Sequence, residues 1–228
     1  MRDRETIIQA LTEPGIVAVV RAGRPLAVEP LVEALLAGGV VAIEITLTTP
    51  GALEALAVAV RGFAPRALMG AGSVVNAAQG KAALAAGAEF LVSPILRPEL
   101  VPLAHGAGRP VMLGAYTPTE AQAAHEAGAD FVKIFPADGL GARYLKAIRG
   151  PLPHLRLVPT GGVDLTTLAD FVRAGCPAVG VGSSLISAER LERADWVGLT
   201  ELAGRYVAAM REARAGRMAR AGSGSGVG

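Results

Sequence analysis

The chain contains little of what several common protein classes depend on. A single cysteine among 228 residues excludes an internal disulfide, so the fold does not rely on an oxidising compartment. No apolar run approaches the roughly 18 to 20 residues of a membrane-spanning helix, and the first five residues, MRDRE, lack the apolar stretch of a secretory signal peptide. We therefore expect a cytoplasmic protein without membrane contact.

Charge is also scarce and nearly balanced. Lys and Arg total 22 against 20 Asp and Glu, without the clustered basic footprint of nucleic-acid-binding proteins. The three histidines do not form a metal set, because His125-Glu126 lacks the second histidine of a zinc helix. Since 51% of the residues are hydrophobic, disorder is excluded over most of the chain. These observations predict neither nucleic-acid binding nor a metal site; the small-molecule partner expected for this chain follows from the family resemblance described below.

A local pattern recurs along the chain. Ala-rich stretches with helical spacing end at Gly38, Gly87, Gly128 and Gly175, and a short apolar run follows each. Glycine commonly ends helices because it adopts the left-handed conformation without steric cost. A nearly continuous β-branched run is typical of a strand that is buried on both faces. The pattern therefore predicts helices and strands in alternation.

Eight apolar runs are expected to be strands: 16–21, 40–46, 67–71, 90–93, 111–115, 131–135, 155–160 and 178–182. Strands that alternate with helices predict parallel βαβ units, and about eight of them favour an α/β fold of the (β/α)8 TIM-barrel type. A doubly wound open sheet is the alternative, although no Gly-x-Gly-x-x-Gly follows the first strand. A leading amphipathic helix over 6–11 could close the bottom of the barrel. We expect one domain from 1 to 215 and a flexible Gly/Ser-rich tail from 216 to 228.

Lys133 is a charged residue inside the apolar run 131–135. The other two lysines, Lys81 and Lys146, fall in expected helices, where solvent exposure explains them. Burial lowers the pKa of a lysine because it disfavours the charged form, and a neutral amine can attack a carbonyl to form a Schiff base. The alternative is a lysine that reaches solvent from a strand end or pairs with a carboxylate. Because active sites of such barrels lie at the C-terminal ends of the strands, we favour a catalytic Lys133.

Glu44 is a second charged residue inside an apolar run, 40–46. Strand alternation places it on one face with Ala42 and Thr46. Burial there should raise the pKa of the carboxyl group toward neutrality, as a general acid/base requires. The alternative is a structural ion pair with an arginine such as Arg21. A buried lysine and a buried carboxylate at strand ends of one barrel favour catalysis.

Glycines follow the expected seventh and eighth strands, in TGG at 160–162 and GSS at 182–184. Glycine lets backbone N–H groups approach an anion, and the N-terminus of a helix expected after 184 adds a positive dipole end. The loops after strands seven and eight are the usual phosphate site of such barrels. One Gly-Gly pair alone is more often a turn, but the two loops together predict a phosphate site at Gly161, Gly162, Gly182 and Ser183.

Five motifs in order carry a family resemblance: EITL at 44–47, GAGSV at 70–74, VSP at 92–94, FVKIFP at 131–136 and PTGGV at 159–163. The chain resembles the class I aldolases that act on 2-keto-3-deoxy-6-phosphogluconate (KDPG) and 4-hydroxy-2-oxoglutarate (KHG), with their 6-phosphogalactonate relatives. The resemblance spans roughly residues 14 to 190. It implies a (β/α)8 barrel, usually a homotrimer, that works through a lysine Schiff base without a metal or another cofactor.

The same resemblance implies roles for single residues. Lys133 matches the imine-forming lysine, and Glu44 matches the general acid/base. Ser73 keeps the hydroxyl of a threonine that commonly binds the pyruvyl carboxylate in the family. The remaining matches contact the substrate or its phosphate group: Pro94, Phe135, Thr160, Gly161, Gly162 and Ser183.

The chain departs from the family at one position. Many members have an arginine four residues after the glutamate, where this chain has Thr48, and a threonine cannot supply a charged bidentate contact. Arg21, at the end of the first expected strand, resembles an arginine found there in the galactonate branch and in some gluconate members. We expect Thr48 and Arg21 to be substrate-binding residues, with Arg21 supplying the missing cation. The preferred sugar acid stays open.

The resemblance implies cleavage of a keto-deoxy sugar acid. KDPG would give pyruvate and glyceraldehyde 3-phosphate, KHG would give pyruvate and glyoxylate, and 2-keto-3-deoxy-6-phosphogalactonate is the alternative substrate. Two other classes remain. One is a phosphosugar isomerase or epimerase with Glu44 as base and an electrostatic Lys133, and the other is a non-catalytic barrel that binds a phosphorylated ligand. Neither explains why a lysine and a carboxylate would be buried together.

Overall fold

Eight parallel strands form one sheet in the computed structural model, which describes residues 2–223 and side chains up to residue 218. The strands are β1 (Ile16–Val20), β2 (Ala42–Thr46), β3 (Leu68–Gly72), β4 (Phe90–Val92), β5 (Val111–Ala115), β6 (Phe131–Ile134), β7 (Leu157–Pro159) and β8 (Val179–Val181). All eight expected strands are confirmed, with ends shifted by at most two residues. The sheet order is β7-β6-β5-β4-β3-β2-β1-β8.

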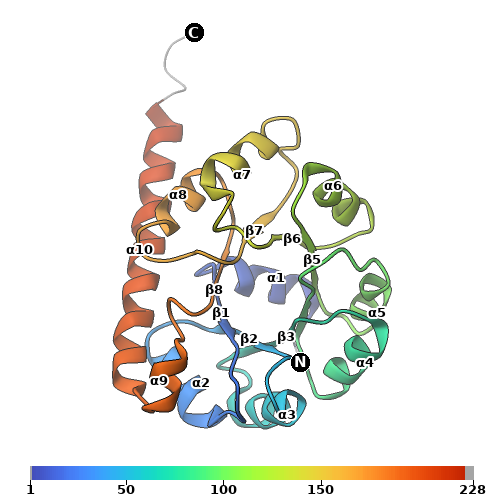
Figure 1. Ribbon diagram of the computed structural model, residues 1–228. Coiled ribbons are helices and arrows are strands. Elements are labelled where there is room, and N and C mark those ends of the chain that lie inside the picture. Colours follow the sequence, from blue (N-terminus) through green and yellow to red (C-terminus); the bar gives the residue numbers. More distant parts are fainter. Residues whose placement is uncertain (1, 224–228) are drawn as a thin grey trace.

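The sheet is nearly closed into a barrel (Figure 1). β8 pairs with β1, and a parallel bridge between Thr160 and Gly180 joins the remaining gap beyond β7. A side chain at Gly180 would overlap the hydroxyl of Thr160, so a glycine is needed where these two strands meet. The predicted (β/α)8 barrel is confirmed, and the open doubly wound sheet is excluded.

Helices surround the barrel and follow the strands in turn (Figure 1). They are α2 (Val28–Ala37), α3 (Ala52–Phe63), α4 (Ala77–Ala85), α5 (Leu100–Gly106), α6 (Pro118–Glu126), α7 (Gly141–Arg149), α8 (Leu168–Arg173), α9 (Ala188–Glu192) and α10 (Trp196–Ser223). Local sequence fixes several of their ends. Thr117 and Glu120 form a capping box at the start of α6, and Gly39, just after α2, has a φ of +85°.

The expected N-terminal helix is present as α1 (Arg4–Thr12) and lies across the bottom of the barrel (Figure 1). Ile7, Ile8 and Leu11 are buried in one apolar cluster with side chains from the strands, including Phe90 and Phe131. Ion pairs tie this end of the chain to the barrel, from Arg4 to Asp130 (2.6 Å) and from Arg2 to Glu89 (2.8 Å). Helix α1 therefore fills the end of the barrel at the N-terminal ends of the strands, and the end at their C-terminal ends stays available for a functional site.

The C-terminal helix α10 packs along α2 and α8 and continues past the barrel (Figure 1). Residues 216–223 are helical, where the sequence predicted the start of a flexible tail; the stretch RMARA at 217–221 consists of good helix formers, so Gly216 alone does not end the helix. Residues 224–228 of that tail lie outside the described residues. None of the helices in residues 2–223 combines the length and the apolar character needed to cross a membrane.

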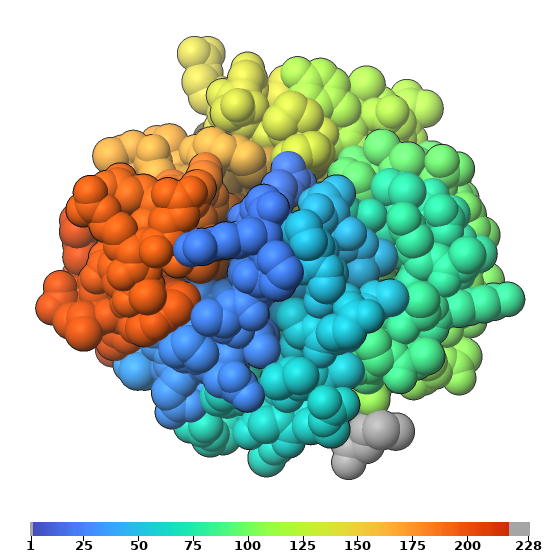
Figure 2. Space-filling model, turned by 60° about the horizontal axis from the view of Figure 1, so that its bottom comes forward, coloured from blue at the N-terminus to red at the C-terminus, as the bar shows by residue number. Residues whose placement is uncertain are grey.

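Segments from the two ends of the chain meet on the face shown in Figure 2, where residues after β1 (blue) lie beside the α9 region (orange). Arg24 donates a hydrogen bond to the carbonyl oxygen of Leu191 at 3.2 Å. This contact joins the loop after β1 to α9, which follows β8.

Candidate active site

Two charged side chains meet inside the barrel. Lys133 extends from β6 and Glu44 from β2, strands that are separated by three others in the sheet. The Lys133 Nζ lies 3.5 Å from the Glu44 Oε1, and the two residues are 5% and 2% exposed. The structure therefore brings the two residues together as the sequence predicted, and it makes Lys133, rather than Arg21, the ionic partner of Glu44.

Close backbone approaches shape the surroundings of this pair. Gly72, at the end of β3, faces Glu44 so closely that a Cβ atom there would overlap the carboxylate. Gly114 on β5 pairs in register with Lys133, and a Cβ atom there would overlap the backbone of Pro94 and Ile95, which cross over it. Sequence reasoning missed both glycines, although a glycine inside an apolar strand is a signal of close approach.

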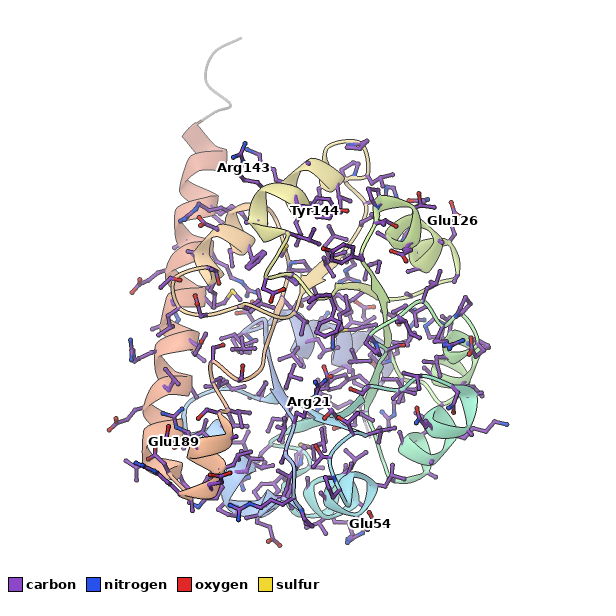
Figure 3. The ribbon with its side chains drawn as sticks, viewed as in Figure 1. Arg21, Glu54, Glu126, Arg143, Tyr144 and Glu189 are labelled. Atoms are coloured by element: carbon purple, nitrogen blue, oxygen red, sulfur yellow. The ribbon has the colours of Figure 1, made fainter. Side chains whose placement is uncertain are left out.

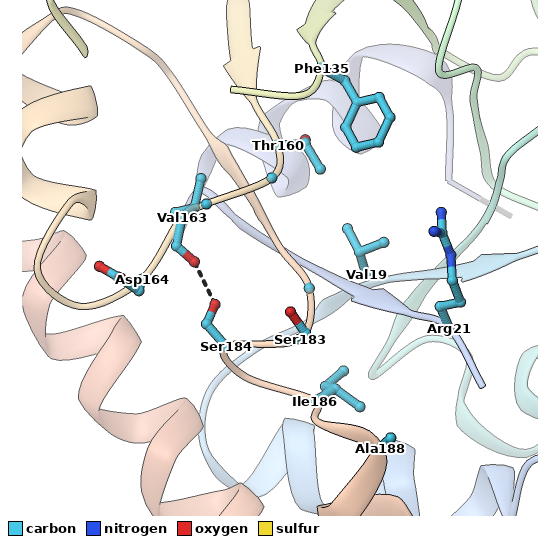
Figure 4. Close-up of a pocket in the computed structure, with 13 residues that line it drawn as sticks. Val19, Arg21, Phe135, Thr160, Val163, Asp164, Ser183, Ser184, Ile186 and Ala188 are labelled. Carbon is cyan, nitrogen blue, oxygen red and sulfur yellow. Dashed lines mark hydrogen bonds between the residues drawn. The ribbon is translucent and has the colours of Figure 1, made fainter. Parts of the chain in front are cut away.

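A cavity of about 370 Å³ lies at the C-terminal ends of β1, β6, β7 and β8 (Figure 4), and neither Lys133 nor Glu44 is among the residues that line it. Seven of the predicted site residues line it: Arg21, Phe135, Thr160, Gly161, Gly162, Gly182 and Ser183. The ring of Phe135 connects the cavity to the pair, because the Lys133 Nζ lies 5.4 Å from its centroid. In Figure 4 the two glycine-containing loops lie on one side of the cavity and Arg21 on the other.

The two loops present backbone donors that the fold itself does not use. The N–H groups of Gly162, Val163, Ser183 and Ser184 donate to no acceptor within residues 2–223. The Ser184 hydroxyl donates to the Val163 carbonyl oxygen and so joins the loops (Figure 4). Free N–H groups that converge on a cavity suit the oxygens of an anion such as phosphate.

The loop after β8 differs from the sequence expectation. Residues 182–186 form a single turn, in which the N–H groups of Leu185 and Ile186 donate to the Gly182 carbonyl oxygen, and α9 begins only at Ala188 behind its N-cap Ser187. The donors of this loop therefore come from a turn and not from a helix N-terminus.

Asp164 is a lining residue that the sequence did not single out. Its carboxylate accepts hydrogen bonds from the hydroxyl of Thr166 and from the backbone and hydroxyl of Thr167. These bonds, the Thr166 hydroxyl first, hold the pKa of Asp164 below its usual value. Asp164 thus stays ionised while it organises the start of α8.

The remaining predicted residues lie outside this cavity. Ser73 directly follows β3 and is half-buried with a φ of +57°, and Pro94 lies two residues after the end of β4. Thr48 is exposed and lines a separate cavity between α3 and α4. The chain turns toward α3 at this point, and the Thr48 hydroxyl lies 3.1 Å from the Thr46 hydroxyl. Arg21, by contrast, does line the active-site cavity, where it is exposed and has no ion-pair partner within the described part of the chain.

Other reactive groups do not form a second centre. Among residues 2–223, no three His, Cys, Asp or Glu side chains gather in a way that could hold a metal ion. Cys176 is buried, and burial raises the pKa of its thiol to about 12, so the thiol stays protonated and unreactive.

Comparisons with known proteins agree with this geometry. The model of the family described as KDPG and KHG aldolase matches residues 7–202. The 2-dehydro-3-deoxy-phosphogluconate aldolase of Treponema pallidum is 37% identical, and the match covers 86% of this chain and 94% of that protein. The 2-dehydro-3-deoxy-6-phosphogalactonate aldolase of Escherichia coli is 34% identical, and the match covers 90% of this chain and 99% of that protein. A solved KDPG aldolase from Legionella pneumophila, with pyruvate captured as a covalent carbinolamine intermediate, is 32% identical with a TM-score of 0.79, covering 86% of this chain and 96% of that one.

The buried pair makes a prediction about stability. Lys133→Met leaves the Glu44 carboxylate buried without its cation, so we expect the free energy of unfolding to fall by about 3 to 5 kcal/mol. Adding Glu44→Leu should restore most of that loss, because two apolar side chains then replace the pair. Urea denaturation measures both changes. As a control, Arg66→Met breaks the exposed pair with Glu33 and should cost about 1 kcal/mol or less. A double variant no more stable than Lys133→Met would contradict this view of the pair.

Proposed function

The chain belongs to the family of KDPG and KHG aldolases, and from that premise we propose that it cleaves KDPG to pyruvate and glyceraldehyde 3-phosphate through a Schiff base on Lys133. It is an aldolase, a lyase that breaks a carbon–carbon bond. The observation that carries the proposed chemistry is the buried Lys133 amine, 3.5 Å from the Glu44 carboxylate and 5.4 Å from the ring centroid of Phe135, which lines a cavity with unused N–H donors. KHG, which would give pyruvate and glyoxylate, is proposed as a second substrate.

The first half of the reaction forms the imine. Lys133 gives its proton to Glu44, either directly or through a water, and the neutral amine attacks the C2 ketone of the substrate. The new N–C2 bond turns the ketone oxygen into the hydroxyl of a carbinolamine. Glu44 returns a proton to that hydroxyl, which leaves as water, and a protonated imine remains. The apolar surroundings of Lys133 support this step because they restrict access of bulk water.

The second half breaks the C3–C4 bond. Glu44, again a carboxylate, takes the proton from the C4 hydroxyl, the C4 oxygen forms an aldehyde, and the bonding electrons flow into the imine. Glyceraldehyde 3-phosphate is released, and an enamine of pyruvate stays on Lys133. Protonation at C3 and hydrolysis of the imine then free pyruvate and restore the amine. The route uses no metal ion and no other cofactor.

The cavity supplies the binding part of the proposal. We assign the substrate phosphate to the loops at 160–163 and 182–184, where Ser183 adds a hydroxyl to the unused N–H groups. We assign the pyruvyl part to Ser73, Pro94 and Phe135, which follow from the family resemblance. Arg21 provides the cation of the active-site cavity. Thr48, which stands where many family members have an arginine, lines a different cavity. Because Arg21 resembles the arginine of the galactonate branch, 2-keto-3-deoxy-6-phosphogalactonate is the alternative to KDPG and KHG as substrate.

We also propose a cytoplasmic homotrimer. The resemblance implies this assembly, and exposed apolar side chains near the site support a subunit contact: Ile95 and Tyr116, each 44% exposed, follow the neighbouring strands β4 and β5. Sedimentation of the full chain should give three times its mass of 23.1 kDa, and a monomer would contradict this assembly.

A coupled pyruvate-release assay tests the reaction. The chain should release pyruvate from KDPG, and rates with KHG and with the galactonate-type substrate rank the candidates. Lys133→Ala should be essentially inactive because the covalent route is lost. Glu44→Gln should lose about 10² to 10⁴ in rate while it still binds substrate, because the phosphate loops are unchanged. Interconversion of phosphosugars without any pyruvate would instead indicate an isomerase or epimerase on the same barrel.

Gly72 makes a second prediction for the same reaction. The Cβ atom of Gly72→Ala must push the Glu44 carboxylate away from Lys133, so kcat should fall by roughly 10²-fold with KM nearly unchanged. Combining Gly72→Ala with Glu44→Asp should cost less than the two single effects together, because the shorter side chain leaves room for the methyl group. Gly23→Ala, where an added Cβ meets no atom within 4 Å, is the control. A Gly72→Ala variant with full activity would show that Glu44 needs no fixed position.

A further inference from the structure

A second cavity lies on the outer surface of the barrel, between α7, α8 and the far part of α10. It measures about 690 Å³, compared with about 370 Å³ for the active-site cavity. Arg143 and Lys146 line it from α7, Asp170 and Arg173 from α8, and Arg217 from α10. Figure 3 shows Arg143 on α7 near the upper part of α10. We call this region the basic cavity.

The charges of the basic cavity are strongly unbalanced. Four cations line it against one carboxylate, and that carboxylate, Asp170, is already paired with Arg173. Arg143, Lys146 and Arg217 have no carboxylate partner among the residues that the structure describes. Three cations repel one another in a hollow whose single carboxylate is already paired with a fourth, and a bound anion relieves that repulsion.

The start of α7 adds backbone donors to the same place. Gly141 and Ala142 line the cavity, Leu140 provides no side-chain cap, and the first turn of α7 holds no acidic residue. The N–H groups of Ala142 and Arg143 donate to no acceptor within residues 2–223. A helix N-terminus favours negative charge, so it acts in the same sense as the three unpaired cations.

One wall of the basic cavity lies beyond the part of the chain that the family shares. The family match ends at residue 202, inside α10, whereas Arg217 lies further along the same helix. The E. coli galactonate aldolase is covered over 99% of its length by 208 residues of this chain. The continuation of α10 beyond the family match therefore contributes Arg217 to the lining of the basic cavity.

We propose that the basic cavity binds an anion with several adjacent phosphate groups, a nucleoside triphosphate or inorganic triphosphate. Cations from three helices surround the hollow, so a ligand must carry several negative charges in a row to reach them all. A single phosphate would leave part of them unmatched. The cavity is also larger than one phosphate requires. The site is separate from the aldolase site and does not depend on its proposed chemistry.

Titration calorimetry of the full-length protein with inorganic triphosphate and with ATP, at physiological ionic strength, tests this proposal. The test variant combines Arg143→Gln, Lys146→Gln and Arg217→Gln. The control combines Arg61→Gln, Lys81→Gln and Arg211→Gln, exposed cations that line no part of the cavity, so the net charge of both variants is the same. Thermal unfolding checks that both variants fold.

We expect the unmodified chain to bind triphosphate, the test variant to bind at least tenfold more weakly, and the control to change less than threefold. Tighter binding of ATP than of triphosphate would identify a nucleotide as the ligand, and equal binding would identify the phosphate chain alone. Three results would overturn the proposal: no binding to the unmodified chain at millimolar triphosphate, equal binding to the chain and the test variant, or an equal loss in the control. Equal binding to the chain and the test variant would place the ligand outside the basic cavity, and an equal loss in the control would mean non-specific attraction.

Discussion

The contact between the amine of Lys133 and the carboxylate of Glu44 is the interaction on which the rest of this structure depends. Burial of an ion pair costs free energy that the attraction between the charges only partly returns, so such a pair contributes little to stability. The surrounding fold accommodates it: β2 and β6 carry the two groups from opposite sides of the ring, Gly72 leaves space for the carboxylate, and α1 fills the barrel below. A costly pair held at the catalytic end of a barrel points to chemistry rather than stability.

The proposed chemistry divides between two kinds of groups. Side chains inside the barrel form and break bonds, while backbone N–H groups of the loops after β7 and β8 hold the anionic end of the substrate. The two parts lie on different elements, so a change in one can leave the other intact. Arg21 and Thr48 illustrate this: the cation of the cavity comes from the end of β1, and the position after β2 lines another hollow without disturbing the pair.

Much of this arrangement could be predicted from the sequence because the signals are local. A β-branched run after a helix-ending glycine identifies a strand, and Lys133 and Glu44 stand out as charges within such runs. The parts that could not be predicted depend on distant contacts. The need for Gly72 and Gly114 arises only when Glu44 and Pro94 come close in space. Thr48 lies outside the active-site cavity because the chain turns toward α3 after β2. Helix α10 continues beyond Gly216 because the residues that follow are good helix formers.

Reduction with borohydride in the presence of pyruvate, followed by mass spectrometry of the digested protein, tests the central claim most directly. The amine of Lys133 should form an imine with pyruvate, and reduction should fix it as a stable adduct on the peptide that contains residues 131–135. An adduct on Lys81 or Lys146 instead, or no adduct while pyruvate is still released from substrate, would contradict the account.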